Sequence, residues 1–161
     1  MGVLECAQRG GRPASLRGSL NLRDTLRTMA SANVELVRKL LKVYNERSFA
    51  ENDELIDPDI VWDMSRVELP DGTSYTGPSE FRNFVENWEE GFASEHMEAQ
   101  EILDAGDRVV AMVHHRGRGR ISGIEVAQHF AMVWTLRAGR AVRMDMYLTL
   151  EEALEAVRLD E

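Results

Sequence analysis

The pattern of apolar and polar residues divides the chain into helical segments followed by extended ones. Asn33 is suited to cap a helix N-terminus, and apolar residues then recur at the spacing of one helix face that ends near Asn45. The residues on that face are Val34, Val37, Leu40, Leu41 and Tyr44. A short second helix is predicted over about residues 50–56. It ends at Asp57-Pro58, because a residue before proline avoids helical angles.

The strongest helical pattern lies in the middle of the chain. Residues 59–64 are predicted to be extended and residues 69–77 to form a loop. Pro78 then suits the first turn of a helix. The apolar residues that keep helical spacing after it are Phe81, Phe84, Val85, Trp88 and Phe92. The pattern therefore predicts a third helix with an aromatic face.

Four extended segments follow, over about residues 95–103, 108–116, 124–136 and 140–148. Short turn-like joints favour antiparallel pairing, because parallel neighbours need a crossover of about a dozen residues or more. At the end, Thr149 to Glu152 fits a capping box before a terminal helix.

Helices followed by a meander of strands predict an α+β fold. We expect a curved antiparallel sheet wrapped around the N-terminal helices, as a cone-like barrel with an internal pocket, and a short C-terminal helix. This domain is predicted to span residues 32–161. Residues 1–31 lack a periodic apolar face and are predicted to be a disordered extension. A ligand would occupy the space between the concave sheet and the helices.

Composition and charge narrow the classes of partner. The net charge is −9, although residues 1–30 hold five arginines against two acidic residues, so the folded part is strongly acidic. An acidic domain repels phosphates, which disfavours nucleic acid as a partner. The arginines at 116, 118 and 120 are interpreted as a solvated strand end. The chain has no apolar run that could cross a membrane and no secretory signal, and its only cysteine is Cys6. We therefore predict a cytoplasmic protein without membrane association.

Three stretches resemble the SnoaL-like group: residues 55–63 (LIDPDIVWD), 75–78 (YTGP) and 133–144 (VWTLRAGRAVRM). This group belongs to the nuclear transport factor two-like superfamily, with ketosteroid isomerase, limonene epoxide hydrolase and polyketide cyclases. The resemblance covers residues 32–157 and implies the fold and a homodimer. Ala131 and Val133 would also leave an apolar outer sheet face exposed in a monomer. Function is not implied, because the superfamily contains enzymes, ligand binders and protein-binding modules.

The catalytic patterns of these enzymes do not match the sequence. The positions where the resemblance requires a tyrosine or an aspartate carry Leu40, Met64, Met132 and Met146. Asp63 and Asp145 stand one residue away, and in a strand such a shift points a side chain to the opposite face. We interpret both as surface carboxylates.

The candidate site is therefore mainly apolar. Methionines would form an adaptable lining, aromatic rings would stack on a planar ligand, and Gln128 would be a neutral polar group inside. The predicted ligand-binding residues are Tyr44, Trp62, Met64, Trp88, Phe92, His114, Gln128, Met132, Trp134 and Met146. No catalytic residue is assigned, and the candidates are an inward His114 and Asp63. The histidines lack the spacing of metal ligands, and we predict neither a metal nor a cofactor.

Three functions agree with this pattern. The first is binding of a small hydrophobic molecule without assigned activity. The second is an isomerase, cyclase or hydratase acting on a polyketide- or steroid-like substrate. The third is a dimeric protein-interaction module. An inward titratable side chain would favour the enzyme. A sealed apolar cavity would favour the binder or the interaction module. A sheet face covered by another chain would favour the interaction module.

Overall fold

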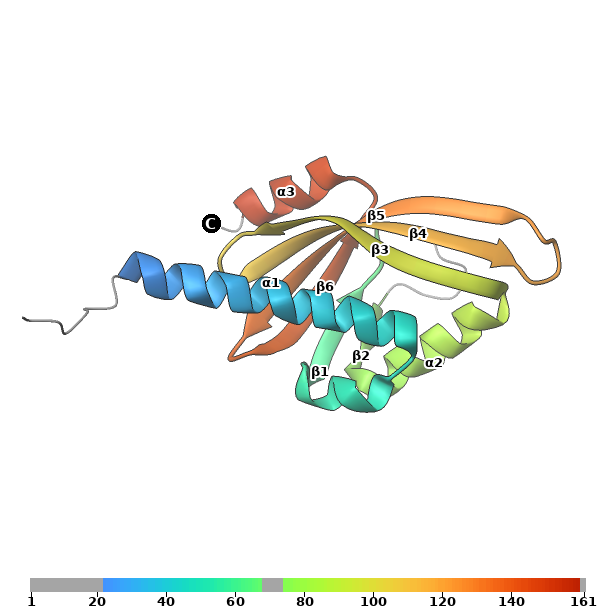
Figure 1. Cartoon of the computed structure of the whole chain (residues 1–161), viewed down its shortest axis with the longest axis horizontal. Helices are drawn as coiled ribbons and strands as arrows, with labels where there is room; N and C mark the ends of the chain where they lie inside the picture. The colour runs from blue at the N-terminus through green and yellow to red at the C-terminus, as the bar shows by residue number, and fades with distance from the viewer. Residues whose placement is uncertain (1–21, 68–73, 160–161) are drawn as a thin grey trace, which may run out of the picture.

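The computed structural model describes residues 22–67 and 74–159, and their side chains except those of residues 22–31, 52 and 159. The elements are α1 (Leu22–Glu46), η1 (Phe49–Glu54), β1 (Ile56–Asp63), β2 (Ser74–Thr76), α2 (Gly77–Glu90), β3 (Phe92–Asp104), β4 (Arg108–Gly119), β5 (Glu125–Arg137), β6 (Arg140–Tyr147) and α3 (Leu150–Leu159). Figure 1 shows the helices on both sides of one curved sheet. None of the described helices is long and apolar enough to span a membrane.

Helix α1 begins well before the predicted start at Asn33, so that prediction of the N-cap is wrong. Residues 22–31, predicted to belong to the disordered extension, are helical, and residues 1–21 lie outside the described residues. The Asn33 side chain instead donates a hydrogen bond of 3.1 Å to the Gly106 carbonyl in the turn after β3. Arg47, with φ of 57°, ends the helix in the left-handed region, a common way for a helix to stop.

The four predicted C-terminal strands form the antiparallel meander β3 to β6. The complete sheet has the order β2-β1-β6-β5-β4-β3. β1 is parallel to β6, so the sheet is mixed rather than wholly antiparallel, and it is open at β2 and β3 rather than closed as a barrel. Parallel pairing is possible here because α2 and the first three strands of the meander form the long connection from β1 to β6. The α+β prediction is confirmed.

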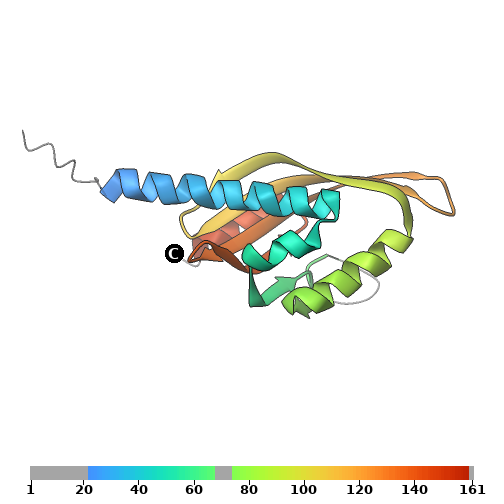
Figure 2. The same ribbon diagram turned by 60° about the horizontal axis from the view of Figure 1, so that its bottom comes forward.

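The two faces of the sheet bury separate apolar clusters. Helices α1 and α2 cover the concave inner face, where the main core lies. Helix α3 covers part of the outer face, and its residues Ala153 and Val157 pack on Val110, Ala131 and Val133. The view in Figure 2 shows α1 and α2 on one side of the sheet, with the β4–β5 hairpin extending past α2.

The cover from α3 removes one reason for the predicted homodimer. Ala131 and Val133 are buried within the chain, so they leave no apolar surface for a second copy to cover. The homodimer stays a prediction from the family resemblance. Helix α3 itself begins as predicted, since the Glu152 amide donates to Thr149 Oγ1 at 3.2 Å in the predicted capping box.

Candidate functional site

A cavity of about 70 Å³ lies between the inner sheet face and the helices. Its wall is almost entirely apolar and includes the methionines Met64, Met97, Met132, Met144 and Met146. The predicted site residues that line it are Tyr44, Trp62, Met64, Trp88, Met132, Trp134 and Met146.

Strand alternation brings these side chains together. At the end of β1, Trp62 and Met64, the residue that follows the strand, are buried inside, and Asp63 between them points outward. Sheet register places Met132 of β5 beside Met146 of β6. The aromatic face of α2 closes the cavity from the other side, where Phe81 stacks on Trp62 at 4.2 Å between ring centroids. Strand alternation thus points Trp62, Met64 and Met132 to the inner side of the sheet.

Three predicted site residues lie elsewhere. His114 is on the outer face, where its ring stacks on His129 at 4.3 Å between centroids, so the prediction of an inward His114 is wrong. By strand alternation Gln128 is on the inner face of β5, but its side chain is exposed. The reason is that β6 ends opposite Ala131 and does not extend along this part of β5. Phe92 packs behind the cavity, against Trp88 and His115.

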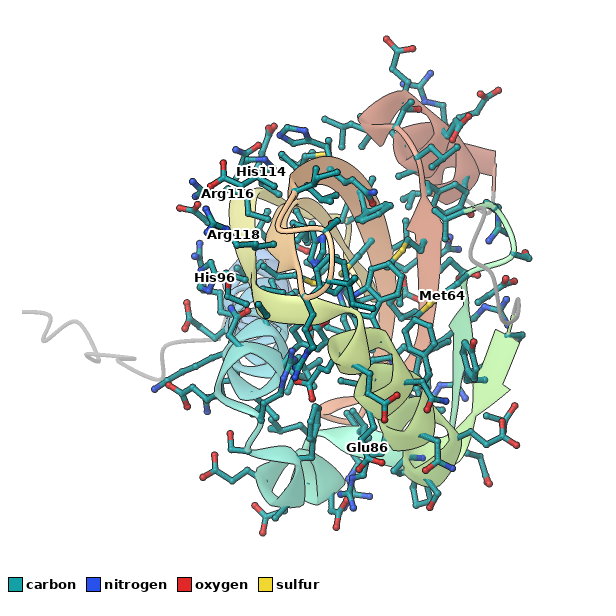
Figure 3. All side chains as sticks on the ribbon, turned by 90° about the vertical axis from the view of Figure 1, so that its right-hand side faces the viewer. Met64, Glu86, His96, His114, Arg116 and Arg118 are labelled. Carbon is teal, nitrogen blue, oxygen red and sulfur yellow. The ribbon has the colours of Figure 1, made fainter. Side chains whose placement is uncertain are left out.

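The outer face of β3 and β4 carries a row of polar side chains. Figure 3 shows His96, His114, Arg116 and Arg118 along this face, away from Met64. Arg116 is paired with Glu98 at 3.0 Å, and Arg118 with Glu125 at 3.1 Å. In the described part of the chain, no three His, Cys, Asp or Glu side chains gather as metal ligands would.

Asp63 and Asp145 also lie on the outer face, as interpreted from the sequence. Arg143 binds both: its Nη2 is 3.0 Å from Asp63 Oδ2, and its Nε is 2.9 Å from Asp145 Oδ2. Burial would raise the pKa of Asp63, but hydrogen bonds from Ser65 and the charges of Arg66 and Arg143 outweigh it, so the pKa is lower than usual. Asp63 is thus an ion-paired carboxylate away from the cavity.

Two inward titratable residues, His115 and Glu95, were missed by the sequence reasoning. His115 of β4 lines the cavity and is 1% exposed, and its Nε2 lies 2.8 Å from Oε2 of Glu95, which is 4% exposed. In the strand register Glu95 is opposite Gly117 and Met97 opposite His115, so the pair is diagonal. No local signal separates His115 from His114, because residues 109–113 are all apolar and give no alternation between the two faces of the strand.

Glu95 is the centre of a buried hydrogen-bond network. Its carboxylate accepts hydrogen bonds from the Tyr44 hydroxyl at 3.0 Å and from Trp88 Nε1 at 2.9 Å, and it is paired with Arg47. Burial would raise the pKa of Glu95, yet the hydrogen bonds from His115 and Tyr44 and the charge of Arg47 hold it below the usual value. Burial and the nearby Glu95 carboxylate raise the pKa of Tyr44.

Two side chains of the wall have a buried polar atom without a hydrogen-bond partner among the described residues. They are Nδ1 of His115 and Nε1 of Trp134. In the tautomer that donates its Nε2–H to Glu95, the free lone pair of the imidazole is on Nδ1. The site thus combines an apolar wall, one unused acceptor and one unused donor.

Known structures share this fold. TerC, crystallised with polyporic acid, is 19% identical with a TM-score of 0.64, over 79% of this chain and 98% of TerC. A protein from Jannaschia sp. CCS1, named as a SnoaL-like polyketide cyclase, is 19% identical with a TM-score of 0.64, over 79% and 92%. A Catenulispora acidiphila protein with a ketosteroid isomerase-like fold, in complex with trimethylamine, is 16% identical with a TM-score of 0.62, over 75% and 90%.

At these identities the structures establish the fold alone, and the searched curated proteins include no match. The sequence model of the SnoaL-like domain family matches residues 37–144. This match contains β1, the aromatic helix α2 and most of the meander, which carry the cavity wall. The chain belongs to the SnoaL-like family.

Proposed function

We propose that this protein binds a small, mostly apolar molecule in the cavity between the sheet and helices α1 and α2. The observation that carries the proposal is the wall itself, in which apolar and aromatic side chains from both layers line a partly enclosed space. Such a space at the concave side of a sheet is the usual form of a small-molecule site.

The size of the cavity indicates that binding requires adjustment. A volume of about 70 Å³ exceeds what one water needs, about 10–15 Å³, but is below the range of about 300–1,000 Å³ for drug-sized ligands. Methionine side chains are unbranched and change rotamer readily, and five of them line this cavity. We therefore expect the methionines to move when a ligand enters.

Family membership supports the proposal. TerC has the same fold and was co-crystallised with polyporic acid, which favours a small organic molecule as the ligand of this chain. The runner-up function, an isomerase, cyclase or hydratase, uses the same cavity. The interaction-module alternative has less support, because α3 covers part of the outer sheet face.

Fluorescence of N-phenyl-1-naphthylamine, a neutral apolar probe, tests the proposal. We expect the full-length protein to enhance its emission saturably. Met132→Asp should weaken this binding at least tenfold, because an unpaired carboxylate would enter the apolar wall. The control is Ala127→Asp, an exposed change on the outer face of the same strand.

The same measurements show which results would refute the proposed site. A fold check by circular dichroism accompanies each variant. No saturable enhancement with the wild-type protein, or equal binding by folded Met132→Asp, would refute the proposed site. If the probe results support the site, mass spectrometry of small molecules released from the purified protein would identify the natural ligand.

A further inference from the structure

A buried histidine that faces an apolar cavity with one ring nitrogen unused has a chemical capability that binding alone does not need. We propose that His115 acts as a general base, taking a proton from the bound molecule through Nδ1, and that Glu95 is its positioning residue. The inference rests on the proposed function, since the reaction takes place in the same cavity.

The geometry of the pair carries the argument. His115 Nε2 and Glu95 Oε2 are 2.8 Å apart, and both side chains are almost fully buried. A carboxylate that accepts one ring N–H fixes the tautomer and leaves the other nitrogen as the base. The unused nitrogen, Nδ1, has no partner in the described part of the chain, although His115 belongs to the cavity wall.

The surroundings hold the imidazole in place. Met97 stands opposite His115 in β3, Trp88 packs on it from α2 at 5.9 Å between ring centroids, and Phe92 contacts it edge-on at 5.5 Å. A base held in this way loses little freedom when it reacts.

The charged and titratable groups around the pair favour proton uptake. Glu95 lies next to His115, Tyr44 and Arg47 bind Glu95 from the end of α1, and Glu89 of α2 pairs with Arg47. Because Glu95 is held ionised by its hydrogen bonds, its negative charge stabilises the imidazolium that forms. The positive charge of Arg47 would oppose the formation of a second positive charge on His115. This effect is weak, because Arg47 is ion-paired with Glu89 and is partly exposed to solvent.

The step is balanced without a cofactor. A C–H bond of the ligand breaks, the proton moves to Nδ1, and the electron pair stays in the ligand as a delocalised anion. Return of the proton to a different carbon gives an isomer and restores the neutral imidazole. The substrate class is therefore an apolar molecule with an acidic C–H, such as an enolisable carbonyl compound.

The second unused atom, Trp134 Nε1, belongs to a different part of the cavity. Trp134 is paired with Val109, six residues along β4 from His115, or about 20 Å at about 3.3 Å per residue. We therefore do not assign this donor to the anion formed beside His115. A test reaction should therefore need a base alone.

Ring opening of 5-nitrobenzisoxazole meets that requirement. A base removes the proton on C3, the electron pair completes a nitrile, and the N–O bond breaks to give a coloured phenolate. We expect the full-length protein to accelerate this reaction, with a rate that rises with pH through one ionisation and is inhibited by N-phenyl-1-naphthylamine. His115→Gln should lower the rate by about 100-fold, the usual order for a general base.

The adjacent histidine provides the matched control. His114→Gln, on the outer face, should leave the rate unchanged. Glu95→Gln should reduce the rate about tenfold. It should also move the midpoint of the pH profile downward, since the charge that stabilises the imidazolium is gone. A purely structural role for Glu95 would leave that midpoint in place.

Separate outcomes identify which proposal fails. If the probe binds but 5-nitrobenzisoxazole is not opened faster than in buffer, or if His115→Gln is folded and fully active, the base assignment is wrong and the binding proposal stands. If the probe does not bind, the binding proposal fails first. If His115→Gln does not fold, absence of probe inhibition in the wild-type reaction would overturn the assignment.

Discussion

Gly117 of β4 lies against the ring of Phe92: a Cβ atom at position 117 would be 2.7 Å from Phe92 Cδ1. Glycine at this position lets the ring cross the strand and reach His115. We expect Gly117→Ala to displace Phe92 and lower the free energy of unfolding by about 1–3 kcal/mol, measured by urea denaturation.

The control for this prediction is Gly91→Ala. There an added Cβ makes only an ordinary contact, 3.4 Å from the Trp88 carbonyl, and the backbone is right-handed with φ of −76°. Stability should change little in the control, and an equally small change in Gly117→Ala would show that Phe92 is not held by Gly117.

The second prediction concerns the pH dependence of stability through Glu95. The pKa of Glu95 is lowered by folding, so its contribution is fully present above the unfolded value of about 4.5 and is lost as pH falls through the lower folded value. At pH 7, Glu95→Gln should cost about 2 kcal/mol, and the difference from wild type should shrink below about pH 4.5. Urea titrations from pH 3 to 7 measure this difference.

Glu98→Gln is the matched control in the same strand. Glu98 is half exposed and paired with Arg116 at the surface, so its loss should change stability by no more than about 0.5 kcal/mol at any pH. A pH-independent difference between wild type and Glu95→Gln would contradict the ionised state of Glu95.

The third prediction separates Asp63 from the cavity. Asp63→Asn removes the charged acceptor of Arg143 Nη2 at position 63, and Arg143 keeps its three hydrogen bonds to Asp145. Stability should fall by about 1 kcal/mol or less, and both probe binding and benzisoxazole opening should be unchanged. Loss of either activity in a folded variant would place Asp63 in the reaction, contrary to its outward position.

The fourth prediction fills the cavity. Met132→Trp adds a ring to a wall around about 70 Å³ and should abolish binding of N-phenyl-1-naphthylamine. Since part of the ring occupies existing space, the stability cost should stay below about 3 kcal/mol. The control is Ala127→Trp, which adds the same ring to the exposed outer face of β5. This variant should bind N-phenyl-1-naphthylamine as the wild-type protein does. Unchanged binding by Met132→Trp would move the site elsewhere.

The fifth prediction tests the cover formed by α3. Val157→Asp places a carboxylate against Val110 and Val133, so we expect a loss of about 2–4 kcal/mol and self-association through the uncovered face. Urea denaturation and sedimentation velocity measure these effects. Leu154→Asp, on the more exposed side of the same helix, is the control. Identical behaviour of the two variants would show that α3 does not protect the sheet.

Local periodicity in the sequence determined to which side of the sheet the side chains point. Alternation in β1 and β5 points Trp62 and Met132 to the same side, and Met64 directly after β1 continues it, because successive side chains of a strand face opposite directions. The helical spacing of α2 likewise determined its aromatic face. These are properties of neighbouring residues, so a single sequence is enough to predict them.

Tertiary structure decided what depends on distant partners. Two adjacent histidines are equivalent in a local pattern, and only the packing of β4 against Trp88 and Glu95 places His115 inside. The parallel pairing of β1 with β6 joins strands far apart in the chain. Gln128 follows the inner alternation yet is exposed, since burial there depends on where β6 ends. The side of a strand to which a residue points is a local property of the chain, whereas burial and ion pairing require the neighbours that folding supplies.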